Sequence, residues 1–285
     1  MAEPTRNRPT FEDPDEWTST LLRYVEGPDG RMELREMPLT PEEFLDPQVG
    51  DTMVQGRQHN LAVIFLFELL ARWFQDRTDV LVLSDLKHLM APHRGPAPDV
   101  SVLMDLEEDF DRDIESYDVR TGIAPNLIIE VVSPSDRRIR KVDEVDKLDL
   151  YERLGVREYL LHDLPTERNG GRASWRGYRL GPSGRYARIK PDSQGRLFSE
   201  TTGFLFGTHP DGSWAEVIDA KTGQRLLSPS EEKDGRLRAE EALRREAEKR
   251  QRETTARRAA EERAASAEAE VARLREELAG LRGKG

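Results

Sequence analysis

The spacing of apolar residues changes period several times along the chain, and the helical stretches are the clearest. Apolar side chains recur at helical spacing over residues 55–74, and again over 142–154, where Gly155 supplies a C-terminal stop. A short helix is also expected after Thr40, because Glu43 completes a capping box with it. The residues expected on the wide buried face of the longest of these helices are Leu61, Ile64, Phe65, Phe67, Leu69, Leu70 and Trp73.

Strand patterns occupy the segments between and after these helices. Short apolar or alternating runs predict strands at 21–25, 80–83, 98–104, 126–132 and 158–162. The order strand, strand, helix, strand indicates an α/β (α+β) core. Residues 172–227 contain several short strand patterns separated by tight turns, which predicts a β-rich extension of that core.

The C-terminal segment 229–281 reads as one long, charged helix. Val271, Leu274, Leu278 and Leu281 fit the apolar seam of a coiled coil over two heptads, but the equivalent upstream positions hold alanine and then charged residues. Two interpretations stay open at this point. The helix either self-associates weakly, giving a homodimer through 229–281, or stands alone in solvent.

Composition narrows the class of protein. The chain has 285 residues with 44 basic and 55 acidic side chains, and the 229 residues before the charged helix carry most of the negative excess. There is no uncharged apolar run of roughly 18 residues and no secretory pattern at the N-terminus, so a cytoplasmic protein without a membrane span is expected. The absence of cysteine excludes disulfides and thiolate chemistry. The acidic balance disfavours non-specific coating of nucleic acid, but not an enzyme that contacts it locally.

The most informative residues are two carboxylates inside predicted strands. Alternation over 126–132 puts Glu130 on the same face as Ile128 and Val132, in the middle of an apolar strand, and Asp99 begins a second such strand. A buried carboxylate needs a cation or strong hydrogen bonds. Each residue alone fits a structural role, such as an arginine partner for Glu130. Together they could converge on a cation if the two strands are neighbours in one sheet.

Positive charge follows the second of these strands. Lys147 lies on the predicted helix at 142–154, four residues before Tyr151, and could be a surface lysine paired with Asp143 or Glu144. A basic run precedes it and either forms a solvated loop or receives a phosphodiester backbone. This run consists of Arg137, Arg138, Arg140 and Lys141.

These residues resemble a known family. The motifs occur in the order Ala97-Pro98-Asp99-Val100, Ile129-Glu130-Val131-Val132-Ser133-Pro134-Ser135, Asp143…Lys147…Tyr151 and Gly155-Val156-Arg157-Glu158-Tyr159. Together they resemble the Uma-two family of restriction endonucleases, a branch of the PD-(D/E)xK nuclease superfamily. The match covers roughly residues 38–165, with weaker agreement to about 227.

The resemblance implies a restriction-endonuclease-like mixed central sheet flanked by helices, with a metal-dependent site for hydrolysing DNA. Asp99, Glu130 and the backbone carbonyl of Val131 would hold Mg²⁺ (or Mn²⁺). The superfamily's lysine position is Val132 here, and Lys147 would take over its role.

Three further residues are possible supporting members of this site: His59, Glu68 and Tyr151. The implied organisation is an N-terminal arm (1–37), a nuclease-like core (38–165), its β-rich extension (166–228) and the charged C-terminal helix (229–285), a possible coiled coil.

The main alternative is a non-catalytic nucleic-acid-binding or assembly protein that keeps the nuclease scaffold. The histidines lack the spacing of a transition-metal site, and no G-x-S-x-G or phosphate-binding glycine loop is present. A sugar hydrolase with paired carboxylates is disfavoured because no aromatic platform surrounds them.

Overall fold

The computed structural model describes residues 19–120, 122–132 and 137–282. The chain divides into two compact units, Met1–Ser228 and Pro229–Gly285, which are described separately below. Much of the arm expected over 1–37 lies outside the described residues, as do Ser133, Pro134 and Ser135 of the family motif. No helix in the described part of the chain is long and apolar enough to cross a membrane.

A mixed six-stranded sheet organises the first unit, in agreement with the mixed central sheet that the family resemblance implies. Its strand order is β11-β10-β9-β8-β6-β4. The strands are β4 (Leu81–Leu83), β6 (Val100–Leu103), β8 (Leu127–Val132), β9 (Glu158–Asp163), β10 (Ser174–Leu180) and β11 (Tyr186–Arg188). Among the described strands of this sheet, only β8 and β9 pair in parallel, and the helical segment between them makes the crossover that a parallel pair requires.

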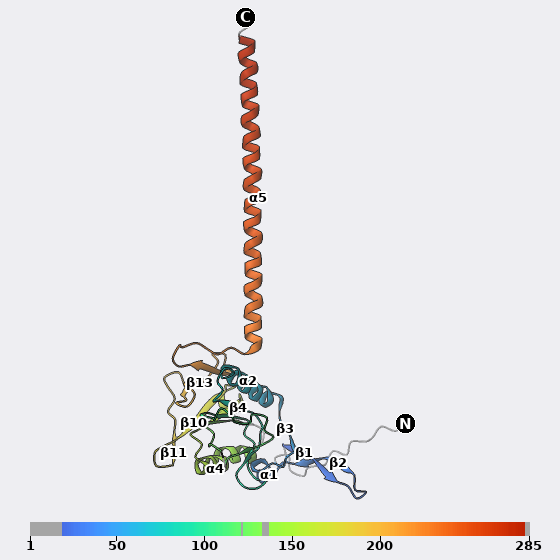
Figure 1. Cartoon of the computed structure of the whole chain (residues 1–285), viewed down its shortest axis with the longest axis vertical. Coiled ribbons are helices and arrows are strands. Elements are labelled where there is room, and N and C mark those ends of the chain that lie inside the picture. The colour runs from blue at the N-terminus through green and yellow to red at the C-terminus, as the bar shows by residue number, and fades with distance from the viewer. Residues whose placement is uncertain (1–18, 121, 133–136, 283–285) are drawn as a thin grey trace. The chain divides into compact units, whose positions relative to one another are not determined.

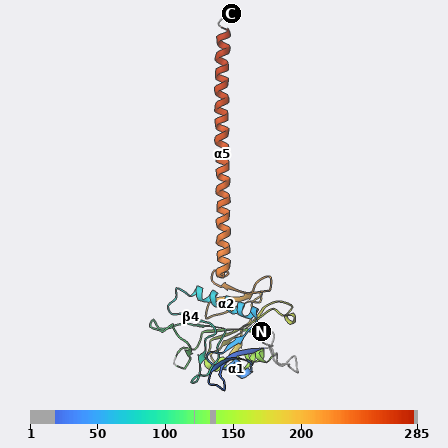
Figure 2. The ribbon, with the colours of Figure 1, turned by 90° about the vertical axis from the view of Figure 1, so that its right-hand side faces the viewer.

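Helices cover both faces of this sheet. Figures 1 and 2 show α2 (Arg57–Trp73) on one side and α1 (Pro41–Leu45) on the other. The predicted capping box of α1 is confirmed, because Thr40 and Glu43 exchange side-chain and backbone hydrogen bonds. The crossover consists of α3 (Arg137–Lys141), a π-helical turn (Val142–Asp146) and α4 (Lys147–Leu154), and Gly155 caps it at a positive φ of 78°. The sequence predicts one regular helix here, so the π-helical turn is a difference.

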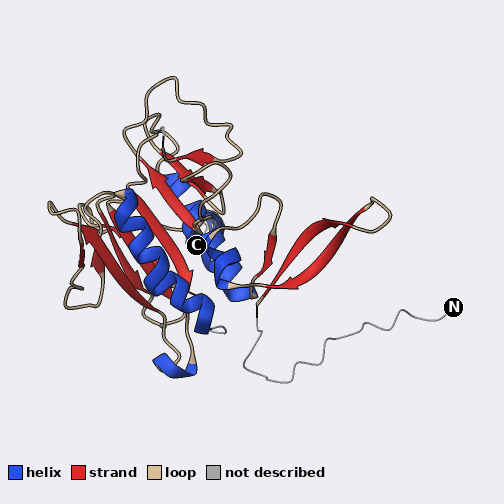
Figure 3. Ribbon diagram, turned by 90° about the horizontal axis from the view of Figure 1, so that it is seen from below, coloured by secondary structure: helices blue, strands red, loops and turns tan. Residues whose placement is uncertain are grey.

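Three smaller sheets and a single 3₁₀ turn complete this unit among the described residues. The first small sheet has the order β2-β1-β3, and Figure 3 shows its β1–β2 hairpin as a long two-stranded ribbon. The second has the order β12-β13-β14, and β5 pairs with β7. These elements are β1 (Thr20–Glu26), β2 (Met32–Pro38), β3 (Thr52–Val54), β5 (His88–Leu89), β7 (Tyr117–Asp118), β12 (Leu197–Phe198), β13 (Phe204–Thr208), β14 (Ala215–Asp219) and the 3₁₀ turn Glu167–Asn169.

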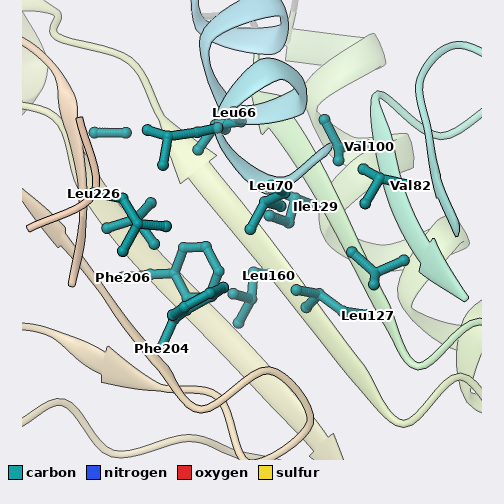
Figure 4. Close-up of a cluster of buried hydrophobic side chains, with 14 of the residues drawn as sticks. Leu66, Leu70, Val82, Val100, Leu127, Ile129, Leu160, Phe204, Phe206 and Leu226 are labelled. Carbon is teal, nitrogen blue, oxygen red and sulfur yellow. The ribbon is translucent and has the colours of Figure 1, made fainter. Parts of the chain in front are cut away.

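The largest apolar core lies between α2 and the sheet. Figure 4 shows Leu66 and Leu70 of α2 beside Ile129 of β8, with Phe204 and Phe206 at the same core. The predicted alternation of β8 is confirmed, since Ile128 and Val132 belong to a separate cluster that also contains Tyr151 of α4. The prediction for α2 needs one correction. Ile64 and Trp73 are about half exposed, and the buried face is instead completed by Ala62, Val63 and Leu66.

The second unit is a single helix, α5 (Pro229–Arg282), of 54 residues, which confirms the long helix predicted from 229. Ion pairs between residues four apart recur along it, for example Arg250 with Glu246 and Arg257 with Glu261. Such pairs stabilise a solvent-exposed helix by a few tenths of a kcal/mol each. Val271 and Leu274 of the expected seam are each 47% exposed. Pairing of two such helices stays a prediction.

Buried His88 should make the protein sensitive to acid. Its Nδ1 donates to the Leu86 carbonyl at 2.7 Å, its Nε2 accepts from the Ser101 hydroxyl at 3.1 Å, and burial lowers its pKa from 6.5 to about 4. In the unfolded chain His88 takes up a proton near pH 6.5, whereas in the folded protein it does so only near pH 4. The free energy of unfolding therefore falls as the pH is lowered from about 6.5 towards 4.

Urea unfolding at pH 7 and pH 5 tests this. The drop in unfolding free energy between the two pH values should be smaller in His88→Gln than in the wild type by about 2 kcal/mol, whatever the variant's stability at pH 7. Equal drops in the two proteins would contradict the prediction.

Candidate functional site

Asp99 and Glu130 come together because their strands are neighbours, as the sequence predicts. β6 and β8 pair antiparallel with Val100 opposite Ile129, which places the preceding Asp99 opposite Glu130. The Val131 N–H donates to Asp99 Oδ2 at 2.6 Å, and the Asp99 N–H makes a long contact of 3.4 Å with Glu130 Oε2. Asp99 is 5% exposed and Glu130 1% exposed. Two acids 31 residues apart in sequence therefore share one buried place in the sheet.

Lys147 lies beside these acids and is fully buried. Its Nζ is 3.0 Å from Glu130 Oε1 and 3.0 Å from Asp143 Oδ1, and it faces the Phe44 ring at 4.1 Å from the centroid. Asp143 Oδ1 is buried and has no hydrogen-bond partner among the described residues, so its polar contact is the ion pair with Lys147. The surface-lysine interpretation is thus right about Asp143 as a partner and wrong about exposure, because both side chains are inside the protein.

Two tyrosines fix the positions of these groups. The Tyr151 hydroxyl donates to Glu130 Oε1 at 2.8 Å, and the Tyr159 hydroxyl donates to the backbone carbonyl of Asp143 at 2.8 Å. The rings meet edge to face with centroids 5.0 Å apart. The site is therefore braced from α4 and from β9, and Tyr151 lies in it as the sequence predicts.

His59 of α2 reaches the cluster from the opposite face of the sheet. Its Nε2 is 3.3 Å from Asp99 Oδ1, and its buried Nδ1 has no hydrogen-bond partner among the described residues. Burial disfavours a charged imidazole, but the Asp99 charge and hydrogen bond outweigh it and raise the pKa of His59. His59 therefore orients one oxygen of Asp99.

The charges in the cluster are unbalanced. Burial raises the pKa of Glu130 to about 8 and that of Asp143 to about 6, against the lowering effect of Lys147. Burial alone would lower the pKa of Lys147, but Asp143 and Glu130 raise it above its usual value. Asp99 is also buried, yet His59, Lys147 and the Val131 N–H lower its pKa. Lys147 stays charged, and the surplus of buried carboxylates falls on Glu130 and Asp143.

The remaining predicted residues lie away from this cluster. Glu68 is exposed on α2, nine residues after His59 and therefore on the opposite side of the helix, so the structure corrects its placement in the site. Arg140 pairs with Glu144 at 2.7 Å and Asp163 at 2.9 Å, which ties α3 to β9. Lys141 is exposed and Arg138 is half-buried. The side chain of Arg137 lies outside the described residues.

A cavity of about 340 Å³ opens onto Asp99. It is lined by residues of the segment from Phe44 to Gln55, by Asp85 and by Lys87. The Lys87 ammonium is held by Asp46 at 3.0 Å, which pins this segment beside the cavity. Sequence reasoning missed Asp85 as a site residue because a loop places it there. It named Asp143 as a possible partner of Lys147, at a spacing of four residues, but did not include it among the site residues.

Among the residues that the structure describes, no three His, Asp or Glu side chains form a complete metal-binding group. Asp99 and Glu130 supply carboxylate oxygens, which are ligands of the hard type, and the His59 ring nitrogen lies 3.3 Å from Asp99 Oδ1.

The first comparison with known proteins decides the family. The model of Uma2, described as "Putative restriction endonuclease", matches residues 32–212, which is more than half of the chain. The chain belongs to the Uma2 (Uma-two) family. Chains of solved structures also match, among them a crystal structure of a putative nuclease belonging to DUF820 from Anabaena variabilis. That match has 17% identity and a TM-score of 0.36, and it covers 61% of this chain and 79% of that one. No curated protein matches.

For this Uma2 member, removing Lys147 should leave uncompensated buried carboxylates. Lys147→Met is expected to lower the free energy of unfolding at pH 8 by about 3–5 kcal/mol. Adding Glu130→Gln should restore part of the loss, because it removes one of the surplus acids. Urea denaturation measures both effects, with exposed Lys141→Met as the matched control. The site description is wrong if the Lys147 and Lys141 variants are equally stable.

Proposed function

We propose that this chain is a metal-dependent endonuclease that hydrolyses phosphodiester bonds in DNA. The observation that carries the proposal is the meeting of Asp99 and Glu130, from two neighbouring strands, beside the buried Lys147. Membership of a family described as restriction endonucleases supports a nuclease activity. The metal and the DNA substrate are the proposed parts.

The residues present fit Mg²⁺ or Mn²⁺. Asp99, Glu130 and Asp143 outnumber the nearby lysine, and burial, helped by the charges of Asp99 and Asp143, raises the pKa of Glu130. A divalent cation would compensate these buried carboxylates. Two carboxylates with the carbonyl of Val131 are fewer ligands than a closed metal site needs. Mg²⁺ tolerates this, because it keeps several waters and is commonly bound through one or two carboxylates plus substrate phosphate.

The side chains divide the remaining work. A bound Mg²⁺ would stabilise the charge that builds on the phosphate in the transition state. Lys147 supplies a fixed positive charge that can donate to a phosphate oxygen or orient the attacking water. Asp143 positions Lys147, Tyr151 positions Glu130, and His59 positions Asp99. These three contacts hold Lys147, Glu130 and Asp99 in fixed positions relative to one another.

A non-catalytic scaffold protein is the alternative, and the burial of the cluster argues against it. Replacing a buried ion group by apolar residues of similar volume is often neutral or stabilising, so folding alone does not require this cluster. A catalytic role explains better why two strand acids, a lysine and the residues that position them are found together.

Purified protein incubated with plasmid DNA and with single-stranded DNA tests the proposal. We expect cleavage with Mg²⁺ or Mn²⁺ and none with chelator. Asp99→Asn and Glu130→Gln should each reduce the rate by at least about 10²-fold, because each removes a ligand of the ion that stabilises the transition state.

Glu68→Gln is the matched control, because it makes the same carboxylate-to-amide change on an exposed face of α2 and should keep the wild-type rate. Full metal-dependent cleavage by Asp99→Asn would reject the mechanism. Metal binding by calorimetry that is the same with and without Glu130→Gln would favour the scaffold alternative.

A further inference from the structure

A second cleft lies at the other end of the six-stranded sheet, where β9 begins and β10 ends. It has a volume of about 870 Å³. Its wall is formed by the residue before β9, the end of β10, the strand β11 and part of β12. The residues are Arg157, Arg179, Leu180, Gly181, Pro182, Ala187, Arg188, Ile189, Lys190, Phe198 and Glu200.

The cleft carries positive charge that nothing in the described residues neutralises. Arg179 is paired with Glu158 at 2.8 Å and Glu200 at 2.6 Å. In contrast, Arg157, Arg188 and Lys190 are exposed and have no ion pair or side-chain hydrogen bond to any described residue. The surrounding sequence is unusual for a chain with a net charge of −11, because residues 169–191 contain six basic and no acidic side chains.

An aromatic ring lies among these cations. Phe198 of β12 is 42% exposed and lines the same cleft. The backbone carbonyl of Phe198 accepts a hydrogen bond from Arg179 at 2.6 Å, which holds the ring's backbone against β10. Unpaired cations around an exposed aromatic ring are the combination that binds single-stranded nucleic acid, with phosphates on the cations and a base stacked on the ring.

Protection of a sheet edge explains only part of this surface. β11 is an edge strand, and lysine or arginine on an edge discourages strand-to-strand aggregation. That role covers Arg188 and Lys190. It does not explain Arg157, which precedes β9 inside the sheet. It also does not explain the exposed ring of Phe198, because an exposed apolar side chain favours aggregation at a sheet edge.

We propose that this cleft is an accessory binding site for a single-stranded segment of nucleic acid. Arg157, Arg188 and Lys190 contact its phosphates, and Phe198 stacks on a base. Leu161 of β9 is opposite Glu130 in the sheet, and Arg157, the residue before β9, lies four residues earlier, or about 13 Å along the strand direction. The cleft thus holds the substrate strand away from the reacting bond. The identification of the polyanion as nucleic acid rests on the proposed function.

Fluorescence anisotropy with a labelled oligothymidylate of about 20 nucleotides tests the site. The full chain is used with chelator, so that binding is measured without cleavage. The triple variant Arg157→Gln/Arg188→Gln/Lys190→Gln should raise the Kd at least about tenfold at moderate salt. It should also make the dependence of log K on log salt shallower by about 2, since each phosphate contact to a single strand contributes ~0.7.

The matched control removes the same three charges elsewhere. Arg238→Gln/Arg252→Gln/Arg258→Gln lies on exposed positions of α5 and should leave the Kd within about twofold of the wild type. Phe198→Ala should weaken binding at least about fivefold with an unchanged salt slope, because it removes stacking and no charge. Tyr24→Ala, at an exposed aromatic of β1, is its control.

A duplex of the same length should bind more weakly than the single strand and be insensitive to Phe198→Ala. The proposal is overturned if the cleft and α5 triple variants lose affinity equally, or if Phe198→Ala leaves binding to the single strand unchanged. Binding is measured with chelator and cleavage with metal, so the two results are independent. Loss of cleavage without loss of binding at the cleft would overturn only the proposed nuclease function. Cleft-independent binding alone would overturn this inference.

Discussion

The structure around the site depends on one buried cation. Lys147 lies inside the protein between Glu130 and Asp143, and its ammonium faces the ring of Phe44. Moving a lone ammonium out of water costs several kcal/mol, so these contacts must all be in place for the crossover helix to pack on the sheet. They connect β8, the π-helical turn, α4 and α1. The ion cluster therefore decides how the crossover sits on β8.

The two faces of the sheet have different tasks as a result. The face under α2 holds a large apolar core, to which β8 contributes Leu127, Ile129 and Val131. The other face holds a small apolar cluster and the charged site. Stability can come from the first face, while the second accommodates the energetic cost of buried charge. His59 is the exception, since it reaches Asp99 from the α2 side.

Local patterns predicted most of the elements and half of the site. The alternation over 126–132 placed Glu130 on the same face as Ile128 and Val132, and the strand pattern at 98–104 placed Asp99 at a strand start. Two features lay beyond local reasoning. The π-helical turn at 142–146 has no periodicity signal strong enough to separate it from a regular helix. Glu68 was misplaced because it follows His59 by nine residues. At about 100° per residue this spacing turns the side chain to the opposite side of the helix.

The positive charges show why a count along the sequence is a poor guide to a polyanion site. The basic run before Lys147 is dense, but Arg140 is engaged by Glu144 and Asp163, and its charge is largely cancelled where it lies. The stretch around β10 and β11 is less dense, yet Arg188 and Lys190 form no ion pair with any described residue, and Glu200 in the same cleft is paired with Arg179. The local field depends on charges left unpaired after folding. In an acidic chain, a few such charges decide where a phosphate backbone can approach.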